Sequence, residues 1–349
     1  MPEPKPPQPI PNPNYSIGSF EQLTPLKDIW AKERKEGDPK INFTFVFGGH
    51  ISAKDLEETK IQFQDCDIYI PEMSGWGKNT DFIYSKLSEG TMSPKQADDL
   101  FTVMDQYHKK AFQYSFNVEQ RRMIYQSRKP IVFIDLREDS KFRKTGDAAI
   151  EEIFYDFQRA KNWRETKEVL KKYLQIYAQM NSSRERMMLE ELPRRIREVL
   201  DRRPDIRKKP EIKVLLFLGA DHAPIYKQVE DLAEGGSVQH YPNNNLDNPG
   251  HRAEGLRRVQ SGEDINSFSD EFLMKIFLEM NFSAIFEKSI KEKSGRIGTR
   301  KVLQQIREVI DSFTREEVSE VYEKVSQGRK FRDVVLEICK EKGIEMRGF

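Results

Sequence analysis

Four segments of the chain carry near-continuous runs of apolar, β-branched and aromatic residues, without an alternation of apolar and polar positions. A continuous run is typical of a strand buried on both faces, as in a parallel sheet that helices cover. A fifth, shorter candidate strand, SVQHY, follows later in the chain. The four expected strands are INFTFVFGGH (41–50), DCDIYIPE (65–72), KPIVFIDLRE (129–138) and IKVLLFLGADH (212–222).

Helical patterns separate these runs. Residues 52–63 predict a short helix after the first strand, and Ser93 and Gln96 form a capping-box pattern at the start of another. A long helical stretch over 147–203 should break or bend near Pro193, because a proline inside a helix removes a backbone hydrogen bond. This alternation predicts an α/β fold, with a mainly parallel sheet flanked by helices.

The two ends of the chain differ from this middle part. Residues 1–18 are rich in proline and lack periodicity, which predicts a disordered tail. The α/β domain should then occupy 19–260. Residues 261–349 are predicted to form a helical C-terminal region, in which Thr314 and Glu317 make another capping-box pattern.

Composition narrows the class of protein. The 349 residues are 37% hydrophobic and 33% charged, with a net charge of +1, so no overall field gathers nucleic acid or anionic lipid. The two cysteines, Cys66 and Cys339, give no disulfide framework or metal motif and are expected to be buried fillers. Without an apolar membrane span or signal core, we expect a cytoplasmic protein with no nucleic-acid or membrane partner.

Polar and ionisable side chains stand at the end of each expected strand. They are His50, Glu72, Asp135 with Arg137, and His222. Since parallel strands end at the same edge of a sheet, where open α/β sheets bind ligands, these residues should converge on one crevice. Asp135 and Arg137 are two positions apart, so both should point the same way from a strand.

This set of residues is compatible with two chemistries. His50, Glu72, Asp135 and His222 are a plausible ligand set for Zn, Mn or Co, which would lower the pKa of a bound water. Without a metal, a histidine would act as general base and Glu72 would orient it. His50, Glu72 and His222 are the catalytic candidates in either case, and the residues leave both chemistries open. No HExxH, GxSxG, Walker A or GxGxxG motif in the required context is present.

The order of these motifs resembles the TraB/Tiki superfamily, to which erythromycin esterase and the haem-binding lipoprotein ChaN are related. In that group the first strand ends in GxxH, matched here by FGGH with His50, although Phe47 replaces the first glycine. The next strand ends in a glutamate, matched by Glu72. FIDLRE matches an IDR-like strand, and GADH, ending at His222, matches a second GxxH. The resemblance covers about 41–241.

The resemblance implies a range of functions. Tiki proteins look like metal-dependent proteases that use the two GxxH histidines and the glutamate, erythromycin esterases are hydrolases, and ChaN binds haem. A helix before the last strand of the group often carries a Glu-Arg pair, here Glu185 and Arg186. We expect Arg137 and Arg186 to hold an anionic group of the substrate.

The expected function is therefore that of a peptidase-like or esterase-like hydrolase acting on a small molecule or a peptide. The alternatives are a non-catalytic protein that binds haem, a metal or a nucleotide in the same crevice, and an interaction scaffold. Self-association into a homo-oligomer is left open.

Overall fold

The computed structural model describes residues 24–48, 53–73, 76–104, 112–137, 139–230, 232, 236–241, 250–282 and 299–344. Within these residues the chain forms a parallel four-stranded sheet with the strand order β2-β3-β1-β4. The predicted α/β class with a mainly parallel sheet is confirmed. The strands are β1 (Lys40–Gly48), β2 (Ile68–Pro71), β3 (Glu211–Gly219) and β4 (Val238–Tyr241).

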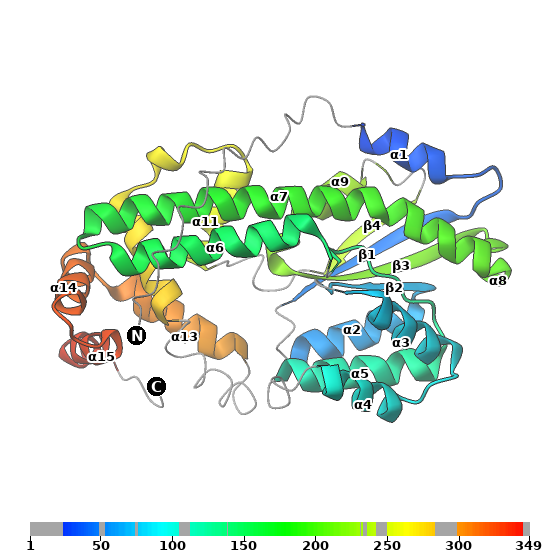
Figure 1. Ribbon diagram of the computed structural model, residues 1–349, viewed down its shortest axis with the longest axis horizontal. Coiled ribbons are helices and arrows are strands. Elements are labelled where there is room, and N and C mark those ends of the chain that lie inside the picture. Colours follow the sequence, from blue (N-terminus) through cyan, green and yellow to red (C-terminus); the bar gives the residue numbers. More distant parts are fainter. Residues whose placement is uncertain are drawn as a thin grey trace, which may run out of the picture.

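Helices cover both faces of this sheet (Figure 1). One layer contains α2, α3, α4 and α5, and the other contains α1, α9 and the C-terminal half of α7. The bounds are α1 (Leu26–Glu33), α2 (Ala53–Asp65), α3 (Lys78–Glu89), α4 (Pro94–Met104), α5 (Phe112–Ser127), α6 (Lys141–Arg159), α7 (Trp163–Arg202), α8 (Pro204–Arg207), α9 (Ile225–Glu230), α11 (His251–Gln260), α13 (Thr299–Ser312), α14 (Arg315–Ser326) and α15 (Phe331–Glu341).

The continuous apolar runs follow from this two-sided cover. In β1, Phe43, Phe45 and Phe47 belong to the core shared with α1 and α7, whereas Val46 belongs to the core shared with α3 and α5. Adjacent strand residues point to opposite faces, so both sets of positions must be apolar when both faces are buried.

The register places the carboxyl ends of the strands at one edge. Strands β1 and β3 pair from Lys40↔Glu211 to Gly48↔Gly219, so they end at the same level. Strand β2 pairs with β3 up to Pro71. Residues that follow β2 and β3 therefore emerge at the same end of the sheet.

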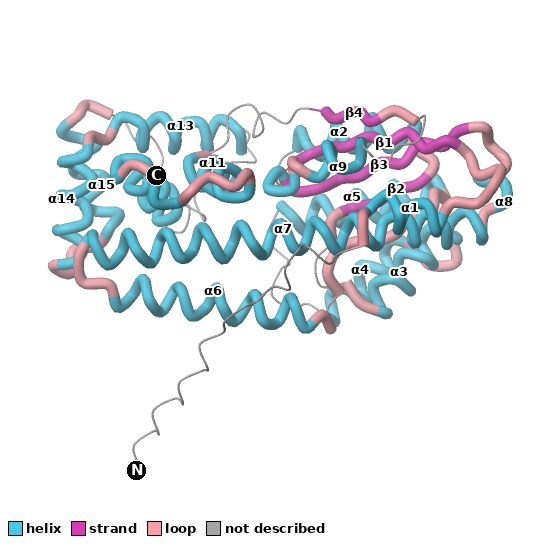
Figure 2. Tube along the Cα trace, turned by 90° about the horizontal axis from the view of Figure 1, so that it is seen from above, coloured by secondary structure: helices cyan, strands magenta, loops and turns pink. Residues whose placement is uncertain are grey.

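The predicted helical extension is also present. Helix α7 runs beyond the sheet beside α6, and its N-terminal half packs with α11, while α13, α14 and α15 lie at that end of the molecule (Figures 1 and 2). Ile153 and Leu256 share an apolar cluster with Ile265 and Leu273. Side-chain packing in the helical part thus crosses the predicted boundary between residues 260 and 261.

The predicted strand at 129–138 is wrong in its extent. Over its described residues, 129–137, this segment makes two isolated parallel bridges, Tyr69↔Ile131 and Trp76↔Arg137. Its partner β2 has only four residues and ends at Pro71, which has no backbone N–H to donate. The ladder therefore cannot continue along the segment.

Of the predicted break or bend near Pro193, the break is wrong, because α7 continues through this proline. Leu189, Leu192 and Ile196 bury the helix against the sheet on both sides of it. The interruption falls instead between α6 and α7. There the Asn162 side chain accepts a 3.0 Å hydrogen bond from the backbone N–H of Glu165 and caps α7.

Several local predictions are confirmed. Thr314 and Glu317 form the capping box of α14, and Ser93 exchanges hydrogen bonds with Gln96 at the start of α4. Cys66 and the cysteine of α15 are buried free thiols, and burial raises the pKa of Cys66 to about 12. Residues 1–18 lie outside the described part. None of the described helices combines the length and apolar character that a bilayer span requires.

Candidate functional site

Two of the predicted residues face each other at the C-terminal edge of the sheet. Glu72 directly follows β2, and His222 ends the short 3₁₀ turn (Ala220–His222) after the neighbouring β3. The Nε2 atom of His222 lies 3.6 Å from Oε1 of Glu72. The Glu72 side chain is 16% exposed and that of His222 only 2%, so solvent reaches the pair from the carboxylate side.

Gly219, at the end of β3, leaves room for the Glu72 carboxylate beside the strand. The backbone N–H of Gly219 donates to Oε2 of Glu72, and a Cβ at Gly219 would lie only 2.9 Å from that oxygen. The first glycine of the GADH motif therefore makes room for the carboxylate and also binds it.

A second carboxylate approaches His222 from the other side. Glu185 of α7 is buried, and its Oε1 lies 3.2 Å from Nδ1 of His222. Burial opposes the charged imidazolium, but the hydrogen bonds to Glu185 and Glu72 outweigh it and raise the pKa of His222 to about 9. The imidazole is therefore charged at neutral pH and carries a proton on each nitrogen.

Arg184, the preceding residue of α7, joins Glu72 to Asp135. Its Nε and Nη2 donate to the two carboxylate oxygens of Asp135 at 2.7 and 2.5 Å, and Nη2 also donates to Oε1 of Glu72 at 2.8 Å. The Asp135 side chain is fully buried. Such a two-pronged pair fixes position as well as charge. We call Glu72, Asp135, Arg184, Glu185 and His222 the edge cluster.

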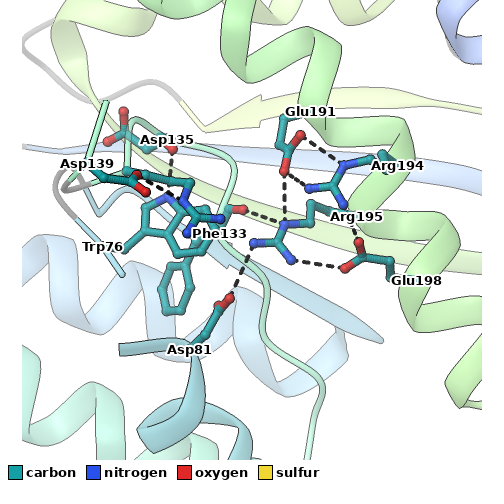
Figure 3. A network of polar contacts seen from close by, with 10 residues as sticks. Trp76, Asp81, Phe133, Asp135, Asp139, Glu191, Arg194, Arg195 and Glu198 are labelled. Atoms are coloured by element: carbon teal, nitrogen blue, oxygen red, sulfur yellow. Dashed lines mark hydrogen bonds and ion pairs between the residues drawn. The ribbon is translucent and has the colours of Figure 1, made fainter. Parts of the chain in front are cut away.

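An aromatic platform holds the segment that carries Asp135 (Figure 3). The indole Nε1 of Trp76 donates a 2.6 Å hydrogen bond to the backbone carbonyl of Asp135. The guanidinium groups of Arg137 and Arg195 lie 5.2 and 4.7 Å from the Trp76 ring centre. Arg195 of α7 also donates to the backbone carbonyl of Phe133 at 3.2 Å. This short segment is thus tied to α7 at its backbone, which positions the Asp135 carboxylate.

The structure does not bring the two predicted anion-binding arginines to the edge cluster. Arg137 is 45% exposed and pairs with Asp139, because its segment is not a regular strand and positions two apart need not share a face. Arg186 pairs with Glu190 on the same helix and also contacts the backbone of Thr24. His50 lies outside the described residues.

Sequence reasoning missed Arg184, and it noted Glu185 only as half of a pair with Arg186. The useful signal was the rotational phase of α7. Glu185 lies three and four positions before the buried Met188 and Leu189, so it stands on the apolar face of the helix. A carboxylate on a buried face requires a partner, and His222 supplies it.

The described part of the edge cluster does not fit a metal centre. Among the described residues, no group of three or more histidine, cysteine, aspartate or glutamate side chains is arranged to hold an ion. Arg184 binds both oxygens of Asp135 and one of Glu72, so its guanidinium stands where that ligand set would need a cation. The metal stays a prediction, because His50 lies outside the described residues.

The edge cluster unites side chains from the ends of two strands, from an extended segment and from α7. Open α/β sheets bind their ligands at this edge. Comparisons of the chain with models of known protein families, with curated proteins and with solved structures find no match. The function is therefore inferred from the chemistry of the edge cluster.

Proposed function

We propose that this protein is a hydrolase of the TraB/Tiki-like type, in which Glu72 and His222 activate water at the C-terminal edge of the sheet. The observation that supports it most is the 3.6 Å approach of His222 Nε2 to Glu72 Oε1, made by residues from two neighbouring strand ends. Glu185 and Arg184 each hold one member of this pair. A buried imidazolium between two carboxylates is a typical device for proton transfer.

The exposure of the pair suggests a division of roles. Glu72 is the more exposed group, so a substrate water is proposed to give its proton to this carboxylate while its oxygen attacks the scissile carbonyl carbon. The imidazolium of His222 donates a proton to the leaving group as the bond to that group breaks. The proton on Glu72 then returns to His222 across their short separation, which restores both groups.

Arg184 and His50 complete the proposal. The guanidinium of Arg184 adds fixed positive charge beside the place where the carbonyl oxygen becomes negative, and such charge stabilises the transition state. His50 follows Gly48 by two residues, and Gly48 pairs with Gly219 at the end of β3. The proposal assigns His50 to the same site as a further proton carrier.

Steady-state kinetics on simple esters and peptide amides tests this function. We expect the wild-type protein to hydrolyse nitrophenyl acetate, nitrophenyl butyrate or a fluorogenic peptide amide. Glu72→Gln should lower kcat/KM by about a hundredfold to ten-thousandfold, the usual range for a proton-transfer group. The matched control is Glu89→Gln, which alters an exposed carboxylate of α3 that pairs with Lys86.

Two outcomes would contradict the proposal. One is a Glu72→Gln variant that keeps the wild-type kcat/KM. The other is a wild-type protein that binds these compounds and turns none over, which would favour the non-catalytic binding alternative. A rate of hydrolysis that is unchanged by chelation and by added Zn, Mn or Co would support the roles proposed for Glu72 and His222, which need no metal. Stimulation by an ion that vanishes in His222→Ala would overturn them.

A further inference from the structure

A cavity of about 440 Å³ lies between α6 and α7 and reaches the edge cluster at Arg184. The Arg184 side chain forms part of its wall, and Nη2 of the same guanidinium group is 2.8 Å from Oε1 of Glu72. Leu136, the residue after Asp135, lines the cavity beside Arg184. The cavity is therefore one guanidinium group away from the proposed catalytic carboxylate.

Arg184 has one nitrogen available for a ligand. Its Nε and Nη2 atoms donate hydrogen bonds to Asp135 and Glu72. Its Nη1 atom makes no hydrogen bond to a described residue and is not fully buried, and the side chain as a whole is 19% exposed. A substrate oxygen that reaches Arg184 can therefore accept a hydrogen bond from Nη1.

The proposed roles at the edge cluster indicate which part of a substrate extends toward this cavity. His222 donates a proton to the leaving group, so the leaving group lies on the side of Nε2. Arg184 stabilises the carbonyl oxygen, which places that oxygen beside the guanidinium group. The acyl group is the remaining substituent of the carbonyl carbon, and it starts next to the arginine that also lines the cavity. The acyl group is thus the part that can extend between α6 and α7.

The cavity follows the two helices lengthwise. On α7 its wall runs from Tyr177 to Arg184, a length of about 10 Å along a helix. A Cβ at Gly146 of α6 would collide with the methyl group of Met180, so these two residues face each other across the helix pair. Helices α6 and α7 lie side by side and are joined by a short turn, so they run in opposite directions (Figure 2). This contact therefore fixes their register along the cavity.

The register orders the apolar side chains along the cavity. Phe142 lies toward Arg184, and Ile150 lies at the other end with Phe154 one turn beyond it. Phe154 is 49% exposed, so the cavity opens to solvent at that end. An apolar wall that extends along two helices suits an unbranched hydrocarbon chain. Two carboxylates also line the cavity, at exposed positions of α6 where solvent hydrates them: Asp147 and Glu151.

We propose that this cavity binds the acyl chain of the substrate, and that the protein prefers esters or amides of unbranched, uncharged acids of medium length. The inference rests on the proposed function and names its substrate class. Arg184 receives the carbonyl oxygen, and the chain runs between α6 and α7 away from the edge cluster. Each methylene group that enters the cavity leaves water for an apolar surface, which favours longer chains.

Hydrolysis of nitrophenyl esters from the acetate to the octanoate tests the inference. We expect kcat/KM to rise by about threefold for each methylene group added to the acyl chain, since burial of such a group is favourable by this order. Lengthening the alcohol from methyl to butyl in esters of butanoic acid should leave kcat/KM nearly unchanged. A kcat/KM that ignores acyl length, or that rises equally with the length of the alcohol, would overturn the inference.

Substitutions at the end of the cavity away from Arg184 locate the chain. Ile150→Trp fills this end and should lower kcat/KM for the octanoate by about tenfold, the effect of two to three methylene groups, and leave the acetate unchanged. The matched control, Ala148→Trp, adds the same ring at an exposed position of α6 that does not line the cavity, and should keep the wild-type preference. An Ile150→Trp protein that retains the full preference for the octanoate would contradict the assignment, as would an Ala148→Trp protein that loses it.

Phe154→Ala provides a second variant with little risk to folding, because this side chain is half exposed. It removes part of the apolar wall and should reduce the preference for the octanoate over the acetate by about threefold. If Ile150→Trp does not fold, this variant decides the question. An unchanged preference in Phe154→Ala would then contradict the assignment.

Binding of methyl ketones separates this inference from the proposed function. Methyl propyl, methyl pentyl and methyl heptyl ketone keep the carbonyl oxygen and have no leaving group, so calorimetry measures their Kd without turnover. If the Kd falls with chain length in the wild type and not in Ile150→Trp, while Glu72→Gln hydrolyses the esters at the wild-type rate, the proposed function fails and the cavity assignment stands. If hydrolysis depends on Glu72 but neither the Kd nor kcat/KM depends on chain length, the cavity assignment fails and the proposed function stands.

Discussion

Two buried ion networks lie at opposite ends of the sheet, and each takes an arginine from α7. At the C-terminal edge, Arg184 binds Glu72 and Asp135. At the N-terminal edge, Arg197 donates a 2.6 Å hydrogen bond to Asp38, which lies two residues before β1. In both networks the arginine is largely buried. The two differ little in the kind of ion pair they contain.

They differ in what surrounds the ion pair. The cavity beside Asp38 and Arg197 holds about 10 Å³, room for about one water molecule, whereas the cavity beside Arg184 holds about 440 Å³. The edge cluster also includes His222, held between Glu72 and Glu185. A buried ion pair is thus by itself weak evidence of function. What distinguishes the C-terminal edge is a histidine with a raised pKa in a cluster whose arginine, Arg184, lines a cavity.

The largest expected effect comes from removing each arginine. Arg184→Ala should lower the free energy of unfolding by about 3–5 kcal/mol, because the buried Asp135 carboxylate loses its charged partner. Arg197→Ala should lower it less, because Asp38 keeps its 3.3 Å ion pair with Arg207. Only Arg184→Ala should also lower kcat/KM of the protein that remains folded. Urea denaturation and ester hydrolysis under folding conditions measure the two quantities. An equal loss of kcat/KM in Arg197→Ala would remove the proposed distinction between the two edges.

The two edges should also respond to opposite ends of the pH scale. The pKa of His222 is about 9 in the folded protein and 6.5 ordinarily. Its contribution to the free energy of unfolding is therefore complete below pH 6.5 and disappears as the pH rises through 9. Burial opposes the charged form of Asp38, but hydrogen bonds from Arg197 and from the backbone of Lys35 lower its pKa below 3.8. The contribution of Asp38 to the free energy of unfolding is therefore present above pH 3.8 and is lost on further acidification.

Urea denaturation across this pH range checks both signs. The alkaline loss attributable to His222 should be at most about 3 kcal/mol, from the difference between its two pKa values. In a plot of the free energy of unfolding against pH, His222→Gln should remove the fall at alkaline pH and keep the fall at acid pH. Asp38→Asn should do the reverse. A stability curve of His222→Gln that still falls between neutral and alkaline pH would show that another group causes that loss.

The smallest expected effect concerns the end of α7 that lies away from the sheet. Asn162→Ala removes the side chain that caps this helix and should lower the free energy of unfolding by about 1 kcal/mol. Because the cap is remote from both ion networks, kcat/KM and the pH dependence of the free energy of unfolding should stay as in the wild-type protein. A change in kcat/KM would indicate that the end of α7 is coupled to the edge cluster.

The sequence predicted the strand-end part of the site better than the helical part. Glu72 and His222 could be placed because Glu72 directly follows one continuous apolar run and His222 ends the short turn after another. Their catalytic roles stay predictions. Asp135 and Arg137 were expected to share a direction, but Asp135 is buried beside Arg184 and Arg137 is exposed, because their segment lacks the regular pairing of a strand.

The helical part required information that no local pattern contains. Arg184 and Glu72 are separated by 112 positions, and they meet because α7 passes the C-terminal edge of the sheet as it runs along one face (Figure 1). The helix does not break at Pro193 for the same reason, because burial of the flanking leucines against the sheet holds it together.

The sequence by itself determined the parallel sheet, its two covering layers and the polar character of its C-terminal edge. It did so because continuous apolar runs are the local consequence of burial on both faces, and because parallel strands end together. Only the tertiary structure decided that Arg184 and Glu185, and not Arg186, complete the edge cluster. The rotation of a long helix about its axis depends on everything it packs against, and one residue more or less turns a side chain by about 100°.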